Sequence, residues 1–332
     1  MSKPYHVVLT DFIRDELKPE RRVLGDIAEV SALGARSEDE LAGRIEDVDG
    51  IVLFHEIVLT RRTIERLRRC KLIVRAGVGY DNVDHGFARQ RGIAVANVPD
   101  YGSEEVADTA IAMMMALARG VHVLNSRLRS REGAWSYLQV VPLARLRGSV
   151  FGVIGLGRIG TAAALRAKAL GMEVVFYDPY KPDGYDKALG VRRVETLGAL
   201  LAQSLVVSIH CPATDETRHM IDAAAIARMP RGSYLVNTAR GPIVDSQAVP
   251  EAIASGHLAG AGIDVYEHEP PGEEDPLVVA WRDPRHPAHH RLILNPHAAF
   301  YSEAGLLDMR LKAAEACRRA ILGLPLRNIV NL

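Results

Sequence analysis

Short apolar runs alternate with amphipathic stretches along the whole chain, a pattern typical of a layered α/β protein. Helices are predicted at residues 37–46, where Ser37 and Glu40 have capping-box spacing, and over the basic stretch 61–69. In the first hundred residues, strands are predicted at 6–10, 28–31, 50–54, 72–75 and 93–97. We expect these elements to form a small parallel α/β domain.

After an interruption at residues 99–102 the same alternation resumes. Ser103 is the predicted N-cap of a long helix that ends near residue 127, and its stripe Met113–Met115 is interpreted as core filling. A helix from residue 245 is expected to begin late or to be distorted at Pro250, because proline would forfeit a hydrogen bond in the helix interior. The other predicted elements are strands at 150–154, 173–177, 205–209, 233–237, 260–264 and 292–294, and helices at 162–169, 222–229 and 303–322.

Candidate chemistry first appears where the strand 150–154 ends. Gly155, Gly157 and Gly160 follow as Gly-x-Gly-x-x-Gly and lead into a helix, and Asp178 comes after the next strand, 18 residues beyond Gly160. In a strand-turn-helix unit such glycines permit a tight turn, close approach of a pyrophosphate and close packing of the helix. A carboxylate at this spacing accepts hydrogen bonds from ribose hydroxyls and repels a 2′-phosphate. The motif therefore predicts an NAD site, with NAD favoured over NADP.

The glycine motif and the strand pattern together predict the fold class. We expect an α/β protein with two doubly wound parallel-sheet domains, a Rossmann NAD-binding domain inserted in a smaller flavodoxin-like substrate domain. The predicted boundaries are residues 102–298 for the NAD-binding domain, and 1–101 with 299–332 for the substrate domain. The final helix is therefore expected to pack on the first domain.

Composition narrows the classes of partner. Lys+Arg and Asp+Glu both number 41, so the net charge of +0 gives no global field to attract nucleic acid or an anionic membrane, and we expect neither as a partner. The histidines around His289 lie in a Pro-rich stretch that reads as a surface loop, and we expect no metal site. Three cysteines without paired spacing, and no apolar signal segment, predict a cytoplasmic protein.

Three side chains with complementary chemistry follow three successive strands of the second domain. Arg240, Glu269 and His297 each lie just beyond a predicted strand, and the carboxyl ends of parallel strands line one crevice. An Arg binds a carboxylate bidentately, a His exchanges a proton with a carbonyl or hydroxyl, and a Glu can orient that His and favour its charged form. Alone, each residue is more often structural, but their shared edge predicts a catalytic group.

These motifs carry a family resemblance. Residues 236–241, 264–270 and 295–299, together with the glycine motif, resemble the NAD-dependent D-2-hydroxyacid dehydrogenases over nearly the whole chain. The resemblance implies that Arg240 binds the substrate carboxylate, that His297 is the general acid/base with Glu269 as its partner, and that the N–H groups of Val78 and Gly79 help to hold the carboxylate. It also implies a cofactor site formed by Gly155, Gly157, Arg158, Ile159, Gly160, Asp178, Cys211, Pro212, Thr217, Thr238, Ala239 and Asp264.

Within that family the chain is similar to the C-terminal binding proteins, which are NAD-binding corepressors. Residues 54–60, 177–180 and 298–303 carry this likeness, which adds Arg75 and His55 to the substrate cleft and places Phe300 where those proteins have tryptophan. In related dehydrogenases a tryptophan in the segment that contains Trp135 reaches the partner subunit, so the resemblance implies a homodimer.

The sequence leaves three functions open. The first is interconversion of a 2-oxo acid and a D-2-hydroxy acid with NAD(H). The second is an NAD(H)-responsive binding protein whose dehydrogenase site is weak or vestigial. The third keeps the fold and changes the substrate, as in the phosphite and formate dehydrogenases. The sequence does not identify the substrate side chain.

Overall fold

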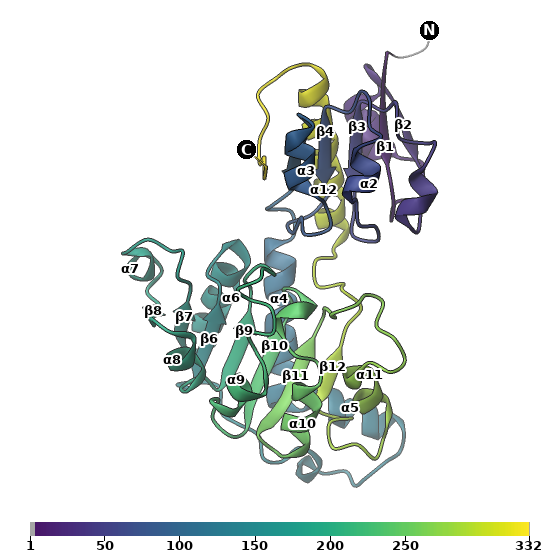
Figure 1. The fold of residues 1–332 in the computed structure, drawn as a ribbon. Coiled ribbons are helices and arrows are strands. Elements are labelled where there is room, and N and C mark those ends of the chain that lie inside the picture. Colours follow the sequence, from purple (N-terminus) through teal and green to yellow (C-terminus); the bar gives the residue numbers. More distant parts are fainter. Residues whose placement is uncertain (1–3, 332) are drawn as a thin grey trace. The chain divides into compact units, whose positions relative to one another are not determined.

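The chain divides into two compact units in the computed structural model, which describes residues 4–331 (Figure 1). The N-terminal unit comprises Met1–Gly102 with Ser302–Leu332, and the inserted unit comprises Ser103–Tyr301. The boundaries drawn from the sequence differ from these by one residue at the first crossing and three at the second. Each unit has its own sheet and its own core.

The N-terminal unit is built on a parallel sheet with the order β2-β1-β3-β4-β5, counted within residues 4–331. This 2-1-3-4-5 order is the flavodoxin-like arrangement. The strands are β1 (Tyr5–Leu9), β2 (Ala28–Ala32), β3 (Gly50–Leu53), β4 (Leu72–Arg75) and β5 (Ala94–Asn97). The helices are α1 (Lys18–Leu24), η1 (Glu38–Leu41, 3-10), α2 (Arg61–Ile64), α3 (His85–Gln90) and α12 (Glu303–Ile321).

The inserted unit has a parallel sheet with the order β12-β11-β10-β9-β6-β7-β8 among the described residues, so the chain reverses direction across the sheet at β6 and β9. The prediction of two doubly wound parallel sheets is confirmed. The strands are β6 (Val150–Ile154), β7 (Glu173–Tyr177), β8 (Arg192–Arg193), β9 (Val206–Ile209), β10 (Ser233–Asn237), β11 (Leu258–Ile263) and β12 (Leu292–Leu294). The helices are α4 (Ser103–Arg119), α5 (Val121–Arg129), η2 (Tyr137–Val140), α6 (Arg158–Ala169), α7 (Tyr185–Leu189), α8 (Leu197–Leu201), α9 (Ala223–Ala227), η3 (Gly241–Ile243), α10 (Ala248–Ala254) and α11 (Pro276–Arg282).

Helix α4 covers one face of the inserted sheet and supplies the predicted methionine packing. Met113 and Met114 are 5% and 0% exposed and belong to the core cluster that includes Phe151 and Val236. A Cβ at Gly262 of β11 would lie 2.8 Å from the Met113 Cβ, so the helix packs directly on the backbone of that strand. The methionine stripe is therefore core, as predicted.

Three helix predictions were wrong because the chain turns sooner than its periodicity indicates. Residues 37–46 form only the short 3-10 helix η1, in which the Ser37 side chain caps nothing. The Glu38 carboxylate instead accepts hydrogen bonds from the N–H and hydroxyl of Thr60, both at 2.8 Å, and Gly43 adopts φ 78°. Tertiary contacts outweigh local helix propensity here.

The long helix predicted from Ser103 is also divided. Gly120 adopts φ 62° and separates α4 from α5, which are bent by 68° relative to one another. Ser103 is itself the first helical residue rather than a cap. Pro250 behaves as predicted, because α10 begins only at Ala248 and the proline lies in its first turn, where its missing N–H costs nothing.

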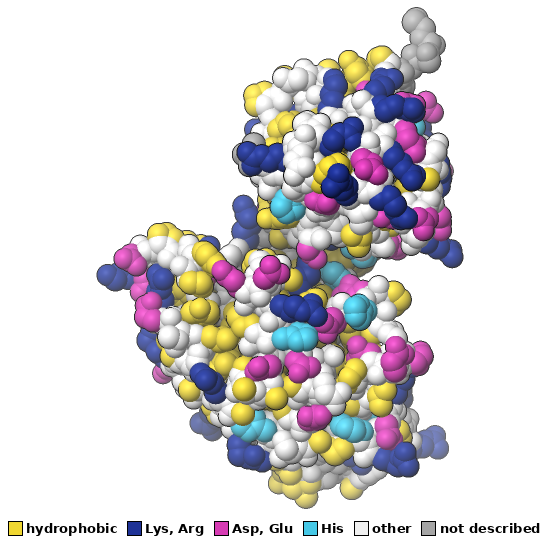
Figure 2. All heavy atoms as spheres, in the orientation of Figure 1, with side chains coloured by type: hydrophobic (Ala, Val, Ile, Leu, Met, Phe, Trp, Pro, Cys, Tyr) yellow, Lys and Arg dark blue, Asp and Glu magenta, His cyan; other side chains and the backbone are white. Residues whose placement is uncertain are grey.

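The basic stretch forms the short helix α2 rather than a helix over 61–69, and ion pairs neutralise much of its charge. Arg62 contacts Asp39 at 2.7 Å, Arg69 contacts Asp49 at 3.1 Å, and Arg68 pairs with Asp47. On the face shown in Figure 2, Lys and Arg side chains are interspersed with Asp and Glu. This stretch is therefore a mixed-charge surface.

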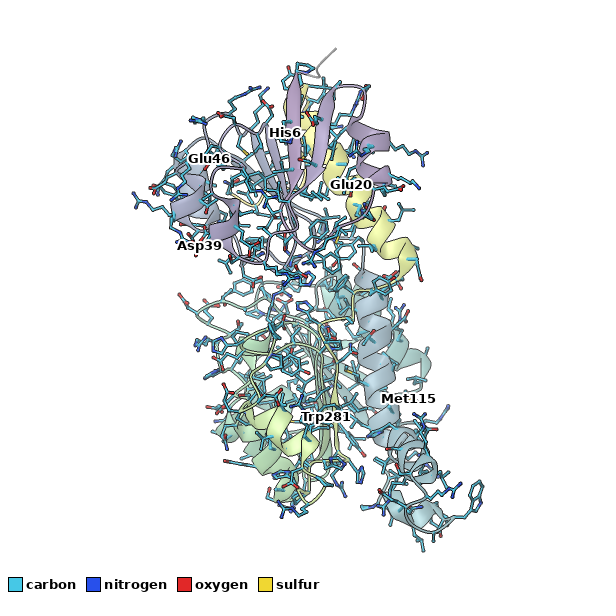
Figure 3. All side chains as sticks on the ribbon, turned by 90° about the vertical axis from the view of Figure 1, so that its right-hand side faces the viewer. His6, Glu20, Asp39, Glu46, Met115 and Trp281 are labelled. Carbon is cyan, nitrogen blue, oxygen red and sulfur yellow. The ribbon has the colours of Figure 1, made fainter. Side chains whose placement is uncertain are left out.

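A buried ion pair fastens α12 to the N-terminal unit. In Figure 3 the yellow helix α12 runs beside the labelled Glu20. The Arg310 guanidinium donates to both carboxylate oxygens of Glu20 at 2.6 and 2.7 Å, and to both oxygens of Asp15 at 2.6 and 2.8 Å. The side chains of Glu20 and Arg310 are 2% and 7% exposed. The last helix of the chain thereby belongs to the first domain.

Within residues 4–331 no single helix is long and apolar enough to span a bilayer, and only the bent pair of α4 and α5 passes on length and composition.

Candidate active site

The glycine turn after β6 has the geometry that the motif predicts. Gly155 adopts φ 87°, and a Cβ there would lie 2.7 Å from the Cys211 nitrogen, so both the turn and the neighbouring loop require glycine. A Cβ at Gly160 would lie 2.1 Å from the Gly155 carbonyl oxygen, which explains why α6 packs so closely on the turn. At Gly157 a Cβ would meet no described atom within 4 Å. The space above Gly157 is where a pyrophosphate would approach.

The start of α6 and the carboxylate of Asp178 complete this end of the site. Gly157 is the N-cap of the helix, so the N–H groups of its first turn, which includes Arg158 and Ile159, have no intrahelical acceptor. Asp178 Oδ2 accepts from the Leu156 N–H at 2.8 Å, and Oδ1 accepts from the Tyr180 N–H at 3.0 Å. Asp178 thus holds the glycine turn, and each carboxylate oxygen retains a lone pair for a ribose hydroxyl.

Replacing Asp178 by alanine should narrow the preference for NADH over NADPH. The change removes the carboxylate that would bind the ribose hydroxyls and repel a 2′-phosphate, so we expect kcat/KM with NADH to fall and the ratio between the cofactors to shrink by roughly tenfold or more. Asp178→Asn is the matched control, because it keeps the side-chain shape and one acceptor oxygen. If Asp178→Ala leaves the kinetics with NADH and NADPH unchanged, this carboxylate does not contact the ribose.

The loops after β9 and β10 carry the other predicted cofactor residues. Thr217 Oγ1 donates to the Pro212 carbonyl at 2.8 Å and accepts from the Thr214 N–H at 2.8 Å, so it closes its own loop. Burial raises the pKa of the Cys211 thiol to about 12, which keeps it neutral. The Thr238 hydroxyl is buried without a hydrogen-bond partner among the described residues, and the Ala239 N–H donates to Asn237 Oδ1 at 3.1 Å. A buried hydroxyl without a partner, at the same edge of the sheet as the glycine turn, suits a site that binds a polar ligand.

Glu269 and His297 form a hydrogen-bonded pair beyond the ends of β11 and β12. Glu269 Oε2 lies 2.6 Å from His297 Nδ1, and Oε1 accepts from the Tyr266 N–H at 2.9 Å. Burial raises the pKa of Glu269, but the hydrogen bond and charge of His297 outweigh this effect, with a further contribution from Arg240, and the net result is a lowered pKa. The carboxylate is therefore ionised and oriented, and the other ring nitrogen of His297, Nε2, is the atom that can exchange a proton.

Asp264 holds the loop that carries His297. Its side chain accepts from Asn295 Nδ2 at 2.5 Å and from the N–H groups of Ala298 and Ala299 at 2.9 and 3.1 Å, and its carbonyl accepts from the His297 N–H at 2.8 Å. Burial raises the pKa of Asp264. The Asp264 carboxylate, which the family resemblance includes in the cofactor site, thus mainly fixes this loop. His297 itself adopts φ 52°, a strained conformation of the kind that persists at functional sites.

Arg240 lies at the start of the loop that follows β10, close to the Glu269 loop. Its Nη1 donates to the Ala239 carbonyl at 2.7 Å, and its charge contributes to the lowered pKa of Glu269. A Cβ at the next residue, Gly241, would lie 1.9 Å from the Tyr266 carbonyl carbon, so glycine is required for the two loops to meet. Phe300 lies on the other side of the pair, with its ring centroid 6.2 Å from that of His297. The structure therefore brings Arg240, Glu269, His297 and Phe300 to one edge of the inserted sheet.

The remaining predicted residues belong to the N-terminal unit, in the loop after β4. Arg75 is 7% exposed, and its Nη1 donates to the Ala76 carbonyl at 3.2 Å. Gly77 adopts φ 147°, and a Cβ there would lie 1.5 Å from Arg75 Nη1, so glycine makes room for the guanidinium. Within residues 4–331 the N–H groups of Val78 and Gly79 have no protein acceptor. Two backbone donors without a protein acceptor, beside a buried cation, have the chemistry that suits binding of an anion.

Several residues that shape the site were not found from the sequence. Tyr266 donates its hydroxyl to the Asn295 carbonyl at 3.2 Å and its N–H to Glu269, so it links the two halves of the pair. Gly241 and Asn295 lie in the sequence motifs that carry the family resemblance, but no role was predicted for either residue. A tyrosine three residues after β11 gives no signal by itself, because the carbonyl that its hydroxyl contacts lies on a loop about thirty residues away.

The geometry described so far is that of a dinucleotide-binding oxidoreductase, and comparison with known proteins identifies the family. Residues 111–299, more than half of the chain, match the model of the D-isomer specific 2-hydroxyacid dehydrogenase NAD-binding domain. The chain is 34% identical over 311 residues to D-3-phosphoglycerate dehydrogenase of Methanocaldococcus jannaschii, covering 94% of this chain and 57% of that protein. It is also 34% identical over 311 residues to C-terminal-binding protein 1 of Caenorhabditis elegans, covering 92% of this chain and 42% of that protein. The chain thus spans about half the length of these relatives.

Solved structures give the same assignment. The TT0316 protein of Thermus thermophilus matches with a TM-score of 0.85 and 31% identity, covering 98% of this chain and 99% of that one. D-lactate dehydrogenase of Aquifex aeolicus, solved with NAD and lactic acid, matches with a TM-score of 0.84 and 27% identity, covering 98% and 99%. The chain therefore belongs to the NAD-dependent D-2-hydroxyacid dehydrogenases, and its cofactor is NAD.

Proposed function

We propose that this protein reduces a 2-oxo acid to the D-2-hydroxy acid with NADH and catalyses the reverse reaction with NAD. The observation that carries the proposal is the Glu269–His297 pair, 2.6 Å apart, at the same sheet edge as Arg240. A binding protein needs no acid/base pair there, whereas carbonyl reduction requires a proton donor beside the carbonyl oxygen.

The residues of this chain divide the work of the reaction. When bound, NADH would supply the hydride. Arg240 binds the substrate carboxylate through its planar fork and polarises the carbonyl, while His297 Nε2 donates the proton to the carbonyl oxygen as the hydride arrives. Glu269 stabilises the imidazolium before transfer and keeps the ring oriented. In oxidation of the hydroxy acid, neutral His297 removes the hydroxyl proton.

The N-terminal unit contributes a second set of carboxylate contacts in this proposal. The N–H groups of Val78 and Gly79, beside the Arg75 guanidinium, are donors of the kind that bind a carboxylate. His55 and Phe300 are further substrate contacts by the family resemblance.

A panel of 2-oxo acids tests the proposal. Purified protein with NADH should oxidise the cofactor at saturating glyoxylate, pyruvate, 4-methyl-2-oxopentanoate or phenylpyruvate, followed by absorbance at the NADH band. Tight NADH binding without turnover on any member would support the NAD-responsive binding protein instead. Turnover of formate or phosphite with NAD, but of no 2-oxo acid, would instead support a function like that of the formate or phosphite dehydrogenases.

Replacing Glu269 by glutamine should move both pH profiles to lower pH. The Glu269 carboxylate favours the protonated form of the His297 ring. Reduction requires this imidazolium, so its rate falls at high pH. Oxidation requires the neutral imidazole, so its rate falls at low pH. Deleting the carboxylate charge therefore moves both limbs of the pH profiles to lower pH together. Reduction at neutral pH should lose more than oxidation. The measurement is kcat/KM against pH in both directions, and limbs that stay in place or move in opposite directions would contradict the pairing.

We also infer a homodimer, and we place the protein in the cytoplasm. The segment after α5 exposes Trp135, Tyr137 and Leu138 at 89%, 73% and 63%, an apolar surface suited to burial against a second copy. Light scattering of the purified protein should give twice the mass of one chain, and a monomer at micromolar concentration would contradict the inference.

A further inference from the structure

An aromatic pair lies at the carboxyl end of the N-terminal sheet, and one of its members was not singled out from the sequence. The Phe12 ring centroid lies 4.8 Å from that of His55, with the planes at 56°, and 5.5 Å from that of Phe54. Phe54 is buried, whereas Phe12 and His55 are half-buried. The two half-buried rings therefore form an aromatic surface above a buried third ring.

This surface lies where a doubly wound sheet places a ligand. In the strand order β2-β1-β3-β4-β5 the chain reverses direction between β1 and β3, and ligands bind outside the carboxyl ends of the strands at such a reversal. Phe12 lies in the loop after β1, and His55 lies in the loop after β3. The pair thus spans the topological switch point of this unit.

A buried carboxylate fixes the two loops to one another. Asp11 is 0% exposed, and its Oδ1 accepts from the Phe54 N–H at 2.9 Å while its Oδ2 accepts from the Glu56 N–H at 2.8 Å. The Thr10 hydroxyl also donates to Oδ1 at 2.7 Å. The backbone on both sides of His55 is therefore held from the β1 loop, and the pair is preorganised.

The backbone of Phe12 adopts a strained conformation. Phe12 adopts φ 63°, in the left-handed region that non-glycine residues rarely occupy, and its N–H donates to Glu56 Oε2 at 3.3 Å. Conformations of this kind persist where the surrounding structure over-determines them, and they cluster at functional sites.

The aromatic pair is also tied to the anion-binding loop after β4. Asn82 Nδ2 donates to the carbonyls of Phe54 and Ile57, both at 2.8 Å, and Asn82 Oδ1 accepts from Arg75 Nε at 3.4 Å. One amide thus connects the loop that presents the Val78 and Gly79 N–H groups to the loop that presents His55. A substrate carboxylate bound at the first of these loops and a substrate side chain bound at the second would therefore contact residues joined by hydrogen bonds.

We propose that Phe12, packed on His55, is the wall that receives the substrate side chain, and that the protein prefers 2-oxo acids with an apolar or aromatic side chain to glyoxylate and pyruvate. This inference rests on the proposed function and adds the substrate class to it. An apolar side chain gains by leaving water for the rings, whereas the hydrogen of glyoxylate gains nothing there.

The test compares kcat/KM for glyoxylate, pyruvate, 4-methyl-2-oxopentanoate and phenylpyruvate. The wild-type protein should favour the two large substrates by about tenfold or more. Phe12→Gly relieves the backbone strain and removes the ring, so the two large substrates should lose roughly 10- to 200-fold while the small ones change by less than about threefold. Phe87→Ala is the matched control, because Phe87 stacks under Arg61 at 4.6 Å on α3, and it should leave the ratio unchanged.

Each outcome decides the inference. A wild-type preference for glyoxylate or pyruvate overturns it, although the proposed function survives. An equal loss on all four substrates in Phe12→Gly overturns it as well, because the ring would then only stabilise the loop. A wild-type protein that turns over none of the four contradicts the proposed function itself, and this inference falls with it.

Discussion

Replacing Arg240 by lysine should lower kcat/KM for the best 2-oxo acid by roughly a hundredfold or more, while NADH affinity changes little. Lysine keeps the charge but loses the planar fork that grips a carboxylate through two parallel hydrogen bonds. The loss should appear in kcat as well as KM, because the same fork polarises the carbonyl in the transition state. The structure holds the Arg240 backbone against the Glu269 loop through Gly241, so a shorter head group cannot recover the contact by a shift of the loop.

The measurement for Arg240→Lys is steady-state kinetics with the four 2-oxo acids, together with NADH binding by fluorescence titration. Arg285→Lys is the matched control, because the Arg285 side chain is 90% exposed and pairs only weakly, at 3.3 Å, with Asp283. It should leave both quantities unchanged. An Arg240→Lys variant that reduces its substrate at near wild-type efficiency would remove Arg240 from the catalytic group.

Replacing Arg310 by methionine should destabilise the protein by about 3–5 kcal/mol, because it leaves the buried Glu20 carboxylate without its cation. The Glu20 side chain is 2% exposed and receives two hydrogen bonds from Arg310. Removing one member of a buried ion pair lowers the free energy of unfolding by more than the intact pair contributes to it, since the desolvation cost of the remaining charge is no longer offset. The loss should be concentrated in the N-terminal unit, because α12 packs there.

Urea denaturation measures this effect, and a double variant separates its cause. Glu20→Met with Arg310→Met should recover most of the loss, because an apolar pair replaces the ionic one. Asp26→Ala is a matched control, since Asp26 lies in the turn after α1 and is the exposed partner of Arg318 on α12, so its removal should change stability little. A double variant as unstable as Arg310→Met alone would show that packing of the arginine stem, rather than the unpaired charge, sets the cost.

The strands were the most predictable part of the fold. The predicted bounds of β4, β6, β7, β10 and β12 agree with the structure residue for residue. A parallel strand covered on both faces must be a short, continuous apolar run, and turn residues delimit it. The helices were less predictable, because distant contacts and glycine turns end or bend them. The helix predicted at 37–46 is cut short by the turn at Gly43 and by the hydrogen bond from Thr60 to Glu38, and the helix predicted from Ser103 is bent at Gly120.

The candidate site divides in the same way. Gly155, Gly160 and Asp178 could be found because they belong to one spacing pattern over residues 155–178, and the close contacts of Gly160 and Asp178 lie within it. Glu269 and His297 could be paired because strand ends share an edge. Phe12 and the Gly241–Tyr266 contact could not, since each depends on the approach of loops 25 or more residues apart.

The most direct test of the central claim follows the hydride itself. Wild-type protein with NADH deuterated at C4 of the nicotinamide, on the face it transfers, and with the best 2-oxo acid should give a hydroxy acid with one deuterium at C2 and the D configuration. His297→Gln should bind NADH normally and form the same labelled product at least about a hundredfold more slowly. A product without deuterium at C2, or one of L configuration, would contradict the assignment of this site to D-2-hydroxy acid chemistry.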